Sequence, residues 1–154
     1  MDLERQHGAA AVEFAIILPF LVLLVYGTIE FGLLLYNQQV LTNASREGAR
    51  AAIVGKCADR LSNSAISQIV NKYCTYTDTT GQTVKRLITF NAANNPPSVS
   101  VVPGSRGCGS GVGAGQDITV SVTYVYDFLA PDILGLGLKK TLTARTAMKM
   151  ESNE

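Results

Sequence analysis

The sequence predicts an α+β fold, with a long N-terminal helix that spans a membrane, a second short helix, and an antiparallel β-sheet packed on the helices. Three patterns in the 154 residues support this prediction. An almost uncharged apolar run lies near the N-terminus. Apolar residues then recur at three- and four-residue spacing. In the C-terminal half they alternate with a period of two, which is typical of strands.

The apolar run covers residues 8–36 and reads GAAAVEFAIILPFLVLLVYGTIEFGLLLY. It contains no charged residue from Phe14 to Ile29. A helix of ~20 apolar residues crosses a bilayer core, and a helix satisfies its own backbone hydrogen bonds there. We therefore predict a transmembrane helix over residues 9–36. Pro19 lies inside it and is expected to kink the helix or loosen one turn.

A short polar leader, MDLERQHG, precedes this run. A secretory signal peptide has its small-residue cleavage site after the apolar region. Here the small residues Gly8 and Ala9 come before that region. Cleavage after Gly8 would remove residues 1–8 and keep the helix, whereas an uncleaved signal anchor would keep both. Arg46, Arg50 and Lys56 follow the helix, so the positive-inside rule does not favour a cytoplasmic N-terminus.

The helix is expected to continue beyond the membrane to about Val54, with Gly55 as its stop. Residues 37–54 contain an amphipathic stripe formed by Leu41, Ala44, Gly48 and Ala52. Arg46, Glu47 and Arg50 lie on another face. This charged face is interpreted as solvated, with pairing between the helices of a bundle as the alternative.

The second helix is predicted to end at Tyr73, with Ser62 or Asp59 as its N-cap. Residues 75–82 are predicted to form a loop. Alternation then predicts strands over residues 84–90, 98–102, 117–128 and 138–150. Because these strands are close in sequence, we expect an antiparallel sheet with one face on the helices.

The remaining motifs argue against catalysis and against cofactor or metal binding. The net charge is only +1, which gives no electrostatic case for nucleic acid. The glycine-rich residues 104–115 lack a Gly-Lys-Ser/Thr element and precede a strand, so we interpret them as a hairpin loop. The single histidine is His7, and the carboxylates are scattered. We therefore expect no active site, no metal site and no cofactor.

The three cysteines are Cys57, Cys74 and Cys108. An odd number suits one disulfide and one free thiol, while an intermolecular bridge or three reduced thiols are the alternatives. The second helix would separate Cys57 from Cys74 by more than ~20 Å, whereas a disulfide needs Cα atoms within about 7 Å. We therefore favour a Cys74–Cys108 bridge, because Cys108 lies in the adaptable glycine-rich loop.

Gly8, the apolar run after it and Glu13 resemble a type IV prepilin leader. The wider stretch, including Pro19 and residues 46–50 (REGAR), resembles the TadE-like family of pseudopilins of tight-adherence (Flp) pilus systems. The resemblance is strongest over residues 8–54 and extends loosely to the final strand. The leader departs from the pattern because it is acidic and has a single arginine.

This resemblance implies a minor pilin or pseudopilin with a pilin-like fold, assembled into or initiating a pilus. A prepilin peptidase would cut after Gly8 on the cytoplasmic side, so that Ala9 becomes the N-terminus and Glu13 the fifth residue. In an assembly, Glu13 would neutralise a free N-terminal amine, which removes two buried charges at once. The resemblance implies a single-pass protein of the inner membrane.

Residues 37–154 would then form a domain outside the cytoplasm, which becomes extracellular in a pilus. The implied partners are other pilin and pseudopilin subunits, the peptidase, the inner-membrane assembly platform and lipid. The alternative is an uncleaved, membrane-anchored extracytoplasmic binding module.

Overall fold

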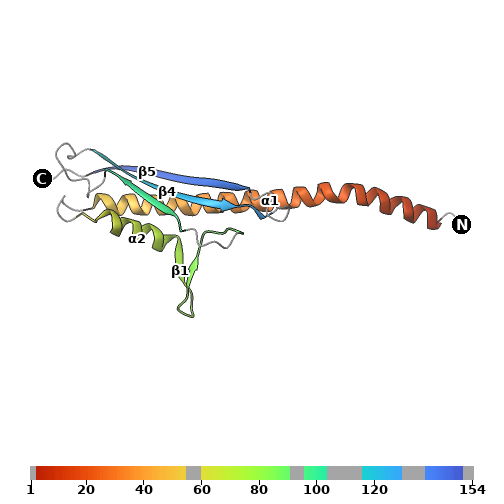
Figure 1. The fold of residues 1–154 in the computed structure, drawn as a ribbon, viewed down its shortest axis with the longest axis horizontal. Helices are drawn as coiled ribbons and strands as arrows, with labels where there is room; N and C mark the ends of the chain where they lie inside the picture. Colours follow the sequence, from red (N-terminus) through yellow and green to blue (C-terminus); the bar gives the residue numbers. More distant parts are fainter. Residues whose placement is uncertain (1–2, 55–59, 91–95, 104–115, 130–137, 151–154) are drawn as a thin grey trace. The chain divides into compact units, whose positions relative to one another are not determined.

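The computed structural model describes residues 3–54, 60–90, 96–103, 116–129 and 138–150. The chain divides into two compact units, residues 1–33 and residues 34–154. Helix α1 spans Leu3–Ile53 and continues without interruption through Pro19 (Figure 1). Its end agrees with the predicted end near Val54. It begins inside the leader, where no residue before Gly8 is a proline or glycine that would end a helix.

In the second unit, the α1 residues from 34 onward present one buried face. The predicted stripe is confirmed, because Leu41 and Ala44 are fully buried and Ala52 is 1 % exposed. At Gly48, an added Cβ atom would lie 2.6 Å from Val70 Cγ2 and 3.3 Å from Val120 Cγ1. Glycine is therefore what allows α1 to approach its neighbours this closely.

Helix α2 spans Asn63–Tyr73 and packs on α1 through Ile66 and Val70. Its end at Tyr73 is the predicted one, and of the two predicted N-caps the structure has Ser62. Ser62 is the N-cap, and its side chain accepts a hydrogen bond from the Ala65 amide at 3.3 Å. This contact satisfies one of the free amides at the start of the helix.

The main sheet consists of β3 (Ser98–Val102), β4 (Asp117–Asp127) and β5 (Lys139–Lys149) in the order β3-β4-β5. Both pairings are antiparallel, and β4 and β5 are paired along their whole length, from Asp117↔Lys149 to Asp127↔Lys139. The alternating residues predicted to share one face of β4 are all buried: Ile118, Val120, Val122, Tyr124 and Tyr126. The period-two pattern therefore fixes the register.

This sheet packs on α1, as Figure 1 shows for the second unit. Ser45 Oγ lies 2.8 Å from Thr146 Oγ1, and the Gln38 side chain donates to the Thr143 carbonyl of β5 at 3.1 Å. The carbonyl of an edge strand thus receives a donor from the helix. The α+β class predicted from the sequence is confirmed.

The predicted loop over residues 75–82 is wrong for residues 75–77, which form a strand, and right for residues 78–82, which form a turn. Strand β1 (Thr75–Thr77) pairs with β2 (Thr83–Lys85) in a separate hairpin. The Asp78 carboxylate accepts from the Thr80 and Gln82 amides at 2.8 and 2.9 Å, and Gly81 has a φ of 83°. The hydrogen bonds from Thr80 and Gln82 lower the pKa of Asp78. An Asp side chain and a glycine with positive φ are what such a tight turn requires.

The predicted strand over residues 84–90 is also too long, because β2 ends at Lys85. The following segment makes its contacts with α1 instead. The fully buried Asn37 side chain donates to the Ile88 carbonyl at 2.7 Å and accepts from the Ile88 amide at 2.9 Å. One asparagine thus replaces the backbone partner that a neighbouring strand would have provided.

Candidate assembly site on the N-terminal helix

The first unit exposes a continuous apolar surface. Every large apolar side chain from Val12 to Phe31 is exposed, with fractions from 37 % at Tyr26 to 73 % at Leu23. Soluble monomers do not carry an apolar surface of this extent. Helix α1 contains, within Gly8–Ile53, a stretch long and apolar enough to cross a membrane. The helix therefore needs lipid or other apolar helices around it.

Gly8, the predicted cleavage position, lies in the helical part of α1 and is exposed. An added Cβ atom at Gly8 would meet no atom within 4 Å. Glycine inside a helix costs about 1 kcal/mol relative to alanine. Neither packing nor backbone conformation among the described residues requires glycine at position 8. Gly27 and Gly32 share this lack of neighbours.

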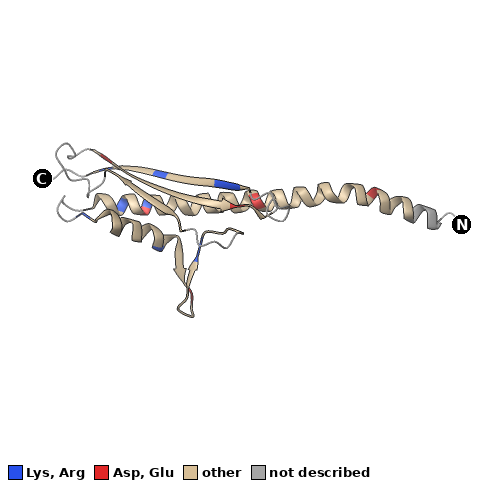
Figure 2. Cartoon of the chain, in the orientation of Figure 1, with Lys and Arg blue, Asp and Glu red and all other residues tan. Residues whose placement is uncertain are grey.

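Glu13 lies four residues after Ala9 on the same exposed helix. Figure 2 shows that α1 carries very little charge in this region. Among the residues that the structure describes, Glu13 has no ion-pair partner. Residues four apart are one turn and ~6 Å apart along the axis of a helix, on the same face. An amine at Ala9 would therefore lie within reach of the Glu13 carboxylate.

Pro19 lies inside α1, between the Glu13 region and the more C-terminal apolar residues. Proline lacks the amide that would donate to the carbonyl four residues earlier. The helix continues through it, and the expected kink stays a prediction. The hydroxyl of Thr28, also in this segment, has partners within the helix, because it donates to the Leu24 and Val25 carbonyls.

Cys74 follows α2 and is buried, with a free thiol. Burial raises its pKa to about 11, and the nearby Arg86 charge opposes this shift. A thiol in this state is protonated and unreactive at neutral pH. Cys74 forms no disulfide with another described residue, and Cys57 and Cys108 lie outside the described residues. The predicted Cys74–Cys108 pairing stays a prediction for the exported protein.

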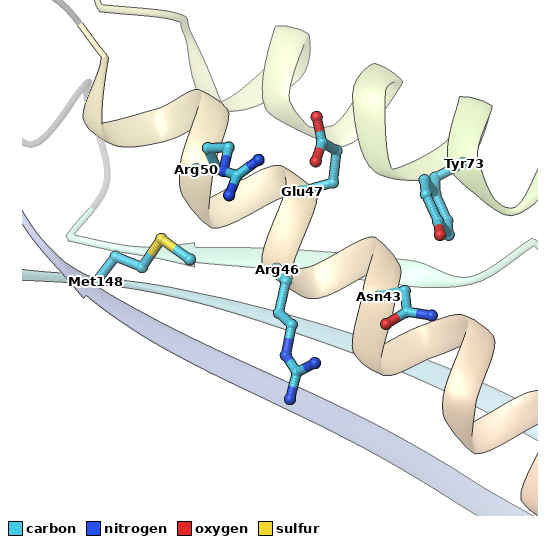
Figure 3. A pocket seen from close by; sticks show the side chains of 6 residues that line it. All are labelled: Asn43, Arg46, Glu47, Arg50, Tyr73 and Met148. Carbon is cyan, nitrogen blue, oxygen red and sulfur yellow. The ribbon is translucent and has the colours of Figure 1, made fainter.

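The structure also forms an open groove that sequence reasoning missed, with a volume of about 370 Å³. It lies in the second unit and is lined by Asn43, Arg46, Glu47, Arg50, Tyr73 and Met148 (Figure 3). The arginines and Glu47 were recognised as a charged face. Tyr73 and Met148 come from distant parts of the chain, and no local pattern in the sequence connects them. Within the described ranges, no three His, Cys, Asp or Glu side chains form a group that could hold a metal ion.

Comparison with known proteins identifies a family for the N-terminal segment. Residues 8–50 match the family model described as TadE-like protein. No curated protein and no solved structure matches the chain. The matched segment contains Gly8, Ala9, Glu13 and Pro19, and it associates the chain with tight-adherence pilus systems, whose TadE-like components are structural. The resemblance to the TadE-like family is therefore confirmed over residues 8–50.

Proposed function

We propose that this protein is a minor pilin or pseudopilin of a tight-adherence pilus. It is made as a prepilin, cut between Gly8 and Ala9, and held in the inner membrane by residues 9–36. Residues 37–154 form its domain outside the cytoplasm. The observation that carries the proposal is the exposed apolar surface of α1 from Val12 to Phe31, together with Glu13 one turn after Ala9 within the family-matched segment.

Cleavage would supply a cationic partner for the Glu13 carboxylate. Before the cut, the carboxylate has no cationic partner among the described residues. An unpaired carboxylate in hydrocarbon costs several kcal/mol. After the cut, the new Ala9 amine lies one turn away, and a neighbouring subunit would offer a second amine. Pairing either amine with Glu13 neutralises both charges.

The exposed apolar side chains would then serve two environments in turn. In the membrane they face lipid, and in a pilus they face the helices of other pilin subunits. Both environments remove the same apolar surface from water at ~25 cal/mol per Å². In this proposal the prepilin peptidase and the inner-membrane assembly platform are the partners that move the chain from one environment to the other, and the protein has a structural role without catalysis.

The test is the mass and N-terminal sequence of the mature protein from its host. We expect wild-type protein to begin at Ala9 and Gly8→Leu protein to stay in the membrane at full length. Gly27→Leu is the matched control, because Gly27 also has no neighbour within 4 Å, and it should be cut normally. A wild-type protein that keeps residues 1–8 would instead favour the uncleaved, membrane-anchored binding module.

Glu13→Ala separates processing from assembly. The variant should be inserted and cut normally, since its helix is more apolar, yet it should enter pili poorly because the amine has lost its partner. Asp117→Ala removes an exposed carboxylate of the second unit that does not line the groove, and it is the control for a change of charge alone. Wild-type incorporation of Glu13→Ala would exclude the pairing role while leaving cleavage intact.

A further inference from the structure

The groove in the second unit follows a strip of α1 that neither α2 nor the sheet covers. Figure 3 shows Tyr73 extending from α2 on one side and Met148 from β5 on the other. Asn43, Arg46, Glu47 and Arg50 belong to α1 and lie between them. Residues 46 and 50 are one helical turn apart. The groove is therefore a concave surface with a basic base and two apolar walls.

The charged side chains of this groove form no ion pairs with other described residues. Arg46, Glu47 and Arg50 are exposed, and none forms an ion pair or a side-chain hydrogen bond with another described residue. By contrast, Lys139 of β5 pairs with the buried Asp127 at 3.3 Å. The two arginines outnumber the single carboxylate, so the groove has a net positive charge available to a partner.

Tyr73 connects the groove to a second basic element. The Arg86 guanidinium lies 5.5 Å from the centre of the Tyr73 ring and 5.9 Å from that of Tyr76. Contacts of this kind hold a guanidinium in place by cation–π attraction without neutralising its charge. Tyr76 is 46 % exposed, and Arg86 is also exposed. Arg86 and Tyr76 do not line the groove, but Tyr73 joins them to it. We call the groove together with these two residues the arginine–tyrosine groove.

We propose that the arginine–tyrosine groove is a docking site for an acidic segment of a partner protein. Tyrosine, arginine and methionine are the residue types enriched in protein interfaces, and tyrosine and arginine dominate their binding energy. An arginine fork binds a carboxylate through two hydrogen bonds. The partner that this surface fits carries carboxylates for Arg46, Arg50 and Arg86 and an apolar side chain between Tyr73 and Met148.

A protein partner fits this groove better than a lipid surface does. Recognition of anionic lipid relies on clusters of lysine and arginine, whereas two arginines and no lysine line the groove. A bilayer surface would also not follow a concave groove with an apolar side chain at each wall. The inference depends on the second unit alone and holds whether or not the chain is cut after Gly8.

The test uses the full-length protein in nanodiscs of zwitterionic lipid. The probe is a short fluorescent amphipathic peptide with glutamates on one helical face and leucine and tyrosine on the other. A twin peptide with lysine at every glutamate position is the ligand control. We expect the acidic peptide to bind, the basic twin not to bind, and added salt to weaken binding because exposed charges are screened.

The double variant Arg46→Glu/Arg50→Glu should weaken binding of the acidic peptide ~10-fold, which corresponds to two exposed pairs at ~0.7 kcal/mol each. Arg145→Glu, an exposed position on β5 that does not line the groove, should change affinity less than ~2-fold. Tyr73→Ala tests the apolar wall and should weaken binding at unchanged charge. Circular dichroism of each sample verifies the fold.

Three results would overturn the proposal. The first is equal binding of the acidic peptide by wild-type protein and the double variant. The second is binding of phosphatidylglycerol vesicles that depends on Arg46 and Arg50 while the acidic peptide does not bind, since this would make the groove a lipid site. The third is self-association of the protein that the double variant abolishes without peptide binding, which would identify a second copy as the occupant.

Discussion

Helix α1 has two halves with the same backbone structure and opposite surroundings. From Val12 to Phe31 every large apolar side chain is exposed, whereas Leu41, Ala44 and Ala49 are fully buried. Both halves mix good helix formers with weaker ones, such as valine, threonine and glycine, so propensity does not explain their different surroundings. The C-terminal half is stabilised by packing against α2 and the sheet of its own chain. The N-terminal half has no such cover, and its stability depends on what surrounds the protein.

The largest expected effect compares one substitution in the two halves. Leu41 is fully buried and Leu23 is 73 % exposed. Leu41→Ala should destabilise the second unit by about 2–5 kcal/mol, because it leaves a cavity. Leu23→Ala should change that stability by less than ~0.5 kcal/mol. Denaturation in detergent, followed by the near-UV circular dichroism of the tyrosines, measures both. Equal losses of stability in the two variants would show that the two halves of α1 do not differ in how they are packed.

Asn37 and Gln38 are adjacent polar residues in the packed half of α1, and their alanine variants should differ in stability. Asn37→Ala leaves the amide and carbonyl of Ile88 without their partner, so it should cost about 1–3 kcal/mol. Gln38→Ala removes one hydrogen bond to Thr143 and should cost less than ~1 kcal/mol. Hydrogen exchange at Ile88 should accelerate in the first variant only. Unchanged exchange at Ile88 in Asn37→Ala protein would contradict this account.

Glycines provide a third test of the same contrast. Gly48→Ala places a Cβ atom 2.6 Å from Val70. Overpacking costs about 1–3 kcal/mol and the better helix propensity returns up to ~1 kcal/mol, so the second unit should lose stability. Gly32 has no neighbour within 4 Å, and Gly32→Ala should leave the second unit unchanged. A gain of stability in Gly48→Ala protein would mean that Val70 moves away easily.

The smallest effect concerns pH and applies to the reduced protein. Burial raises the pKa of Cys74 to about 11 from its ordinary value of 9.0. The unfolded chain therefore loses this proton first, and folding stability falls as the pH rises from 9 to 11. At pH 10 the expected loss is ~1.4 kcal/mol, with none below about pH 8. Cys74→Ala should remove this part of the pH dependence, and an unchanged slope would contradict burial of the thiol.

Local patterns in the sequence predicted the features that depend on neighbouring residues. The end of α1, the Ser62 cap of α2 and the alternating face of β4 all follow from residues a few positions apart. The error at residues 84–90 has a different cause, because Asn37 is 51 residues away from Ile88. Sequence periodicity contains no information about such a partner.

The candidate site likewise contains residues that a local pattern reveals and residues that only the fold brings together. Gly8, Glu13 and Pro19 could be proposed from the sequence because they lie in a short span of one helix. The arginine–tyrosine groove needs α1, α2, β5 and the segment after β2 together. Its charged residues looked like an ordinary solvated face until the topology placed Tyr73 and Met148 beside them.

The contacts between α1 and β5 also determine the order of events during synthesis. Ser45 and Gln38 bind residues that are 101 and 105 positions later in the chain. A ribosome adds ~5–20 residues per second, so the apolar stripe of α1 leaves it about 5–20 s before its covering strand. During that interval α2 can cover part of the stripe, through Ile66 and Val70, and the side that faces β5 is open to water and to other nascent chains. A factor that keeps nascent chains apart would therefore have to act before β5 is made.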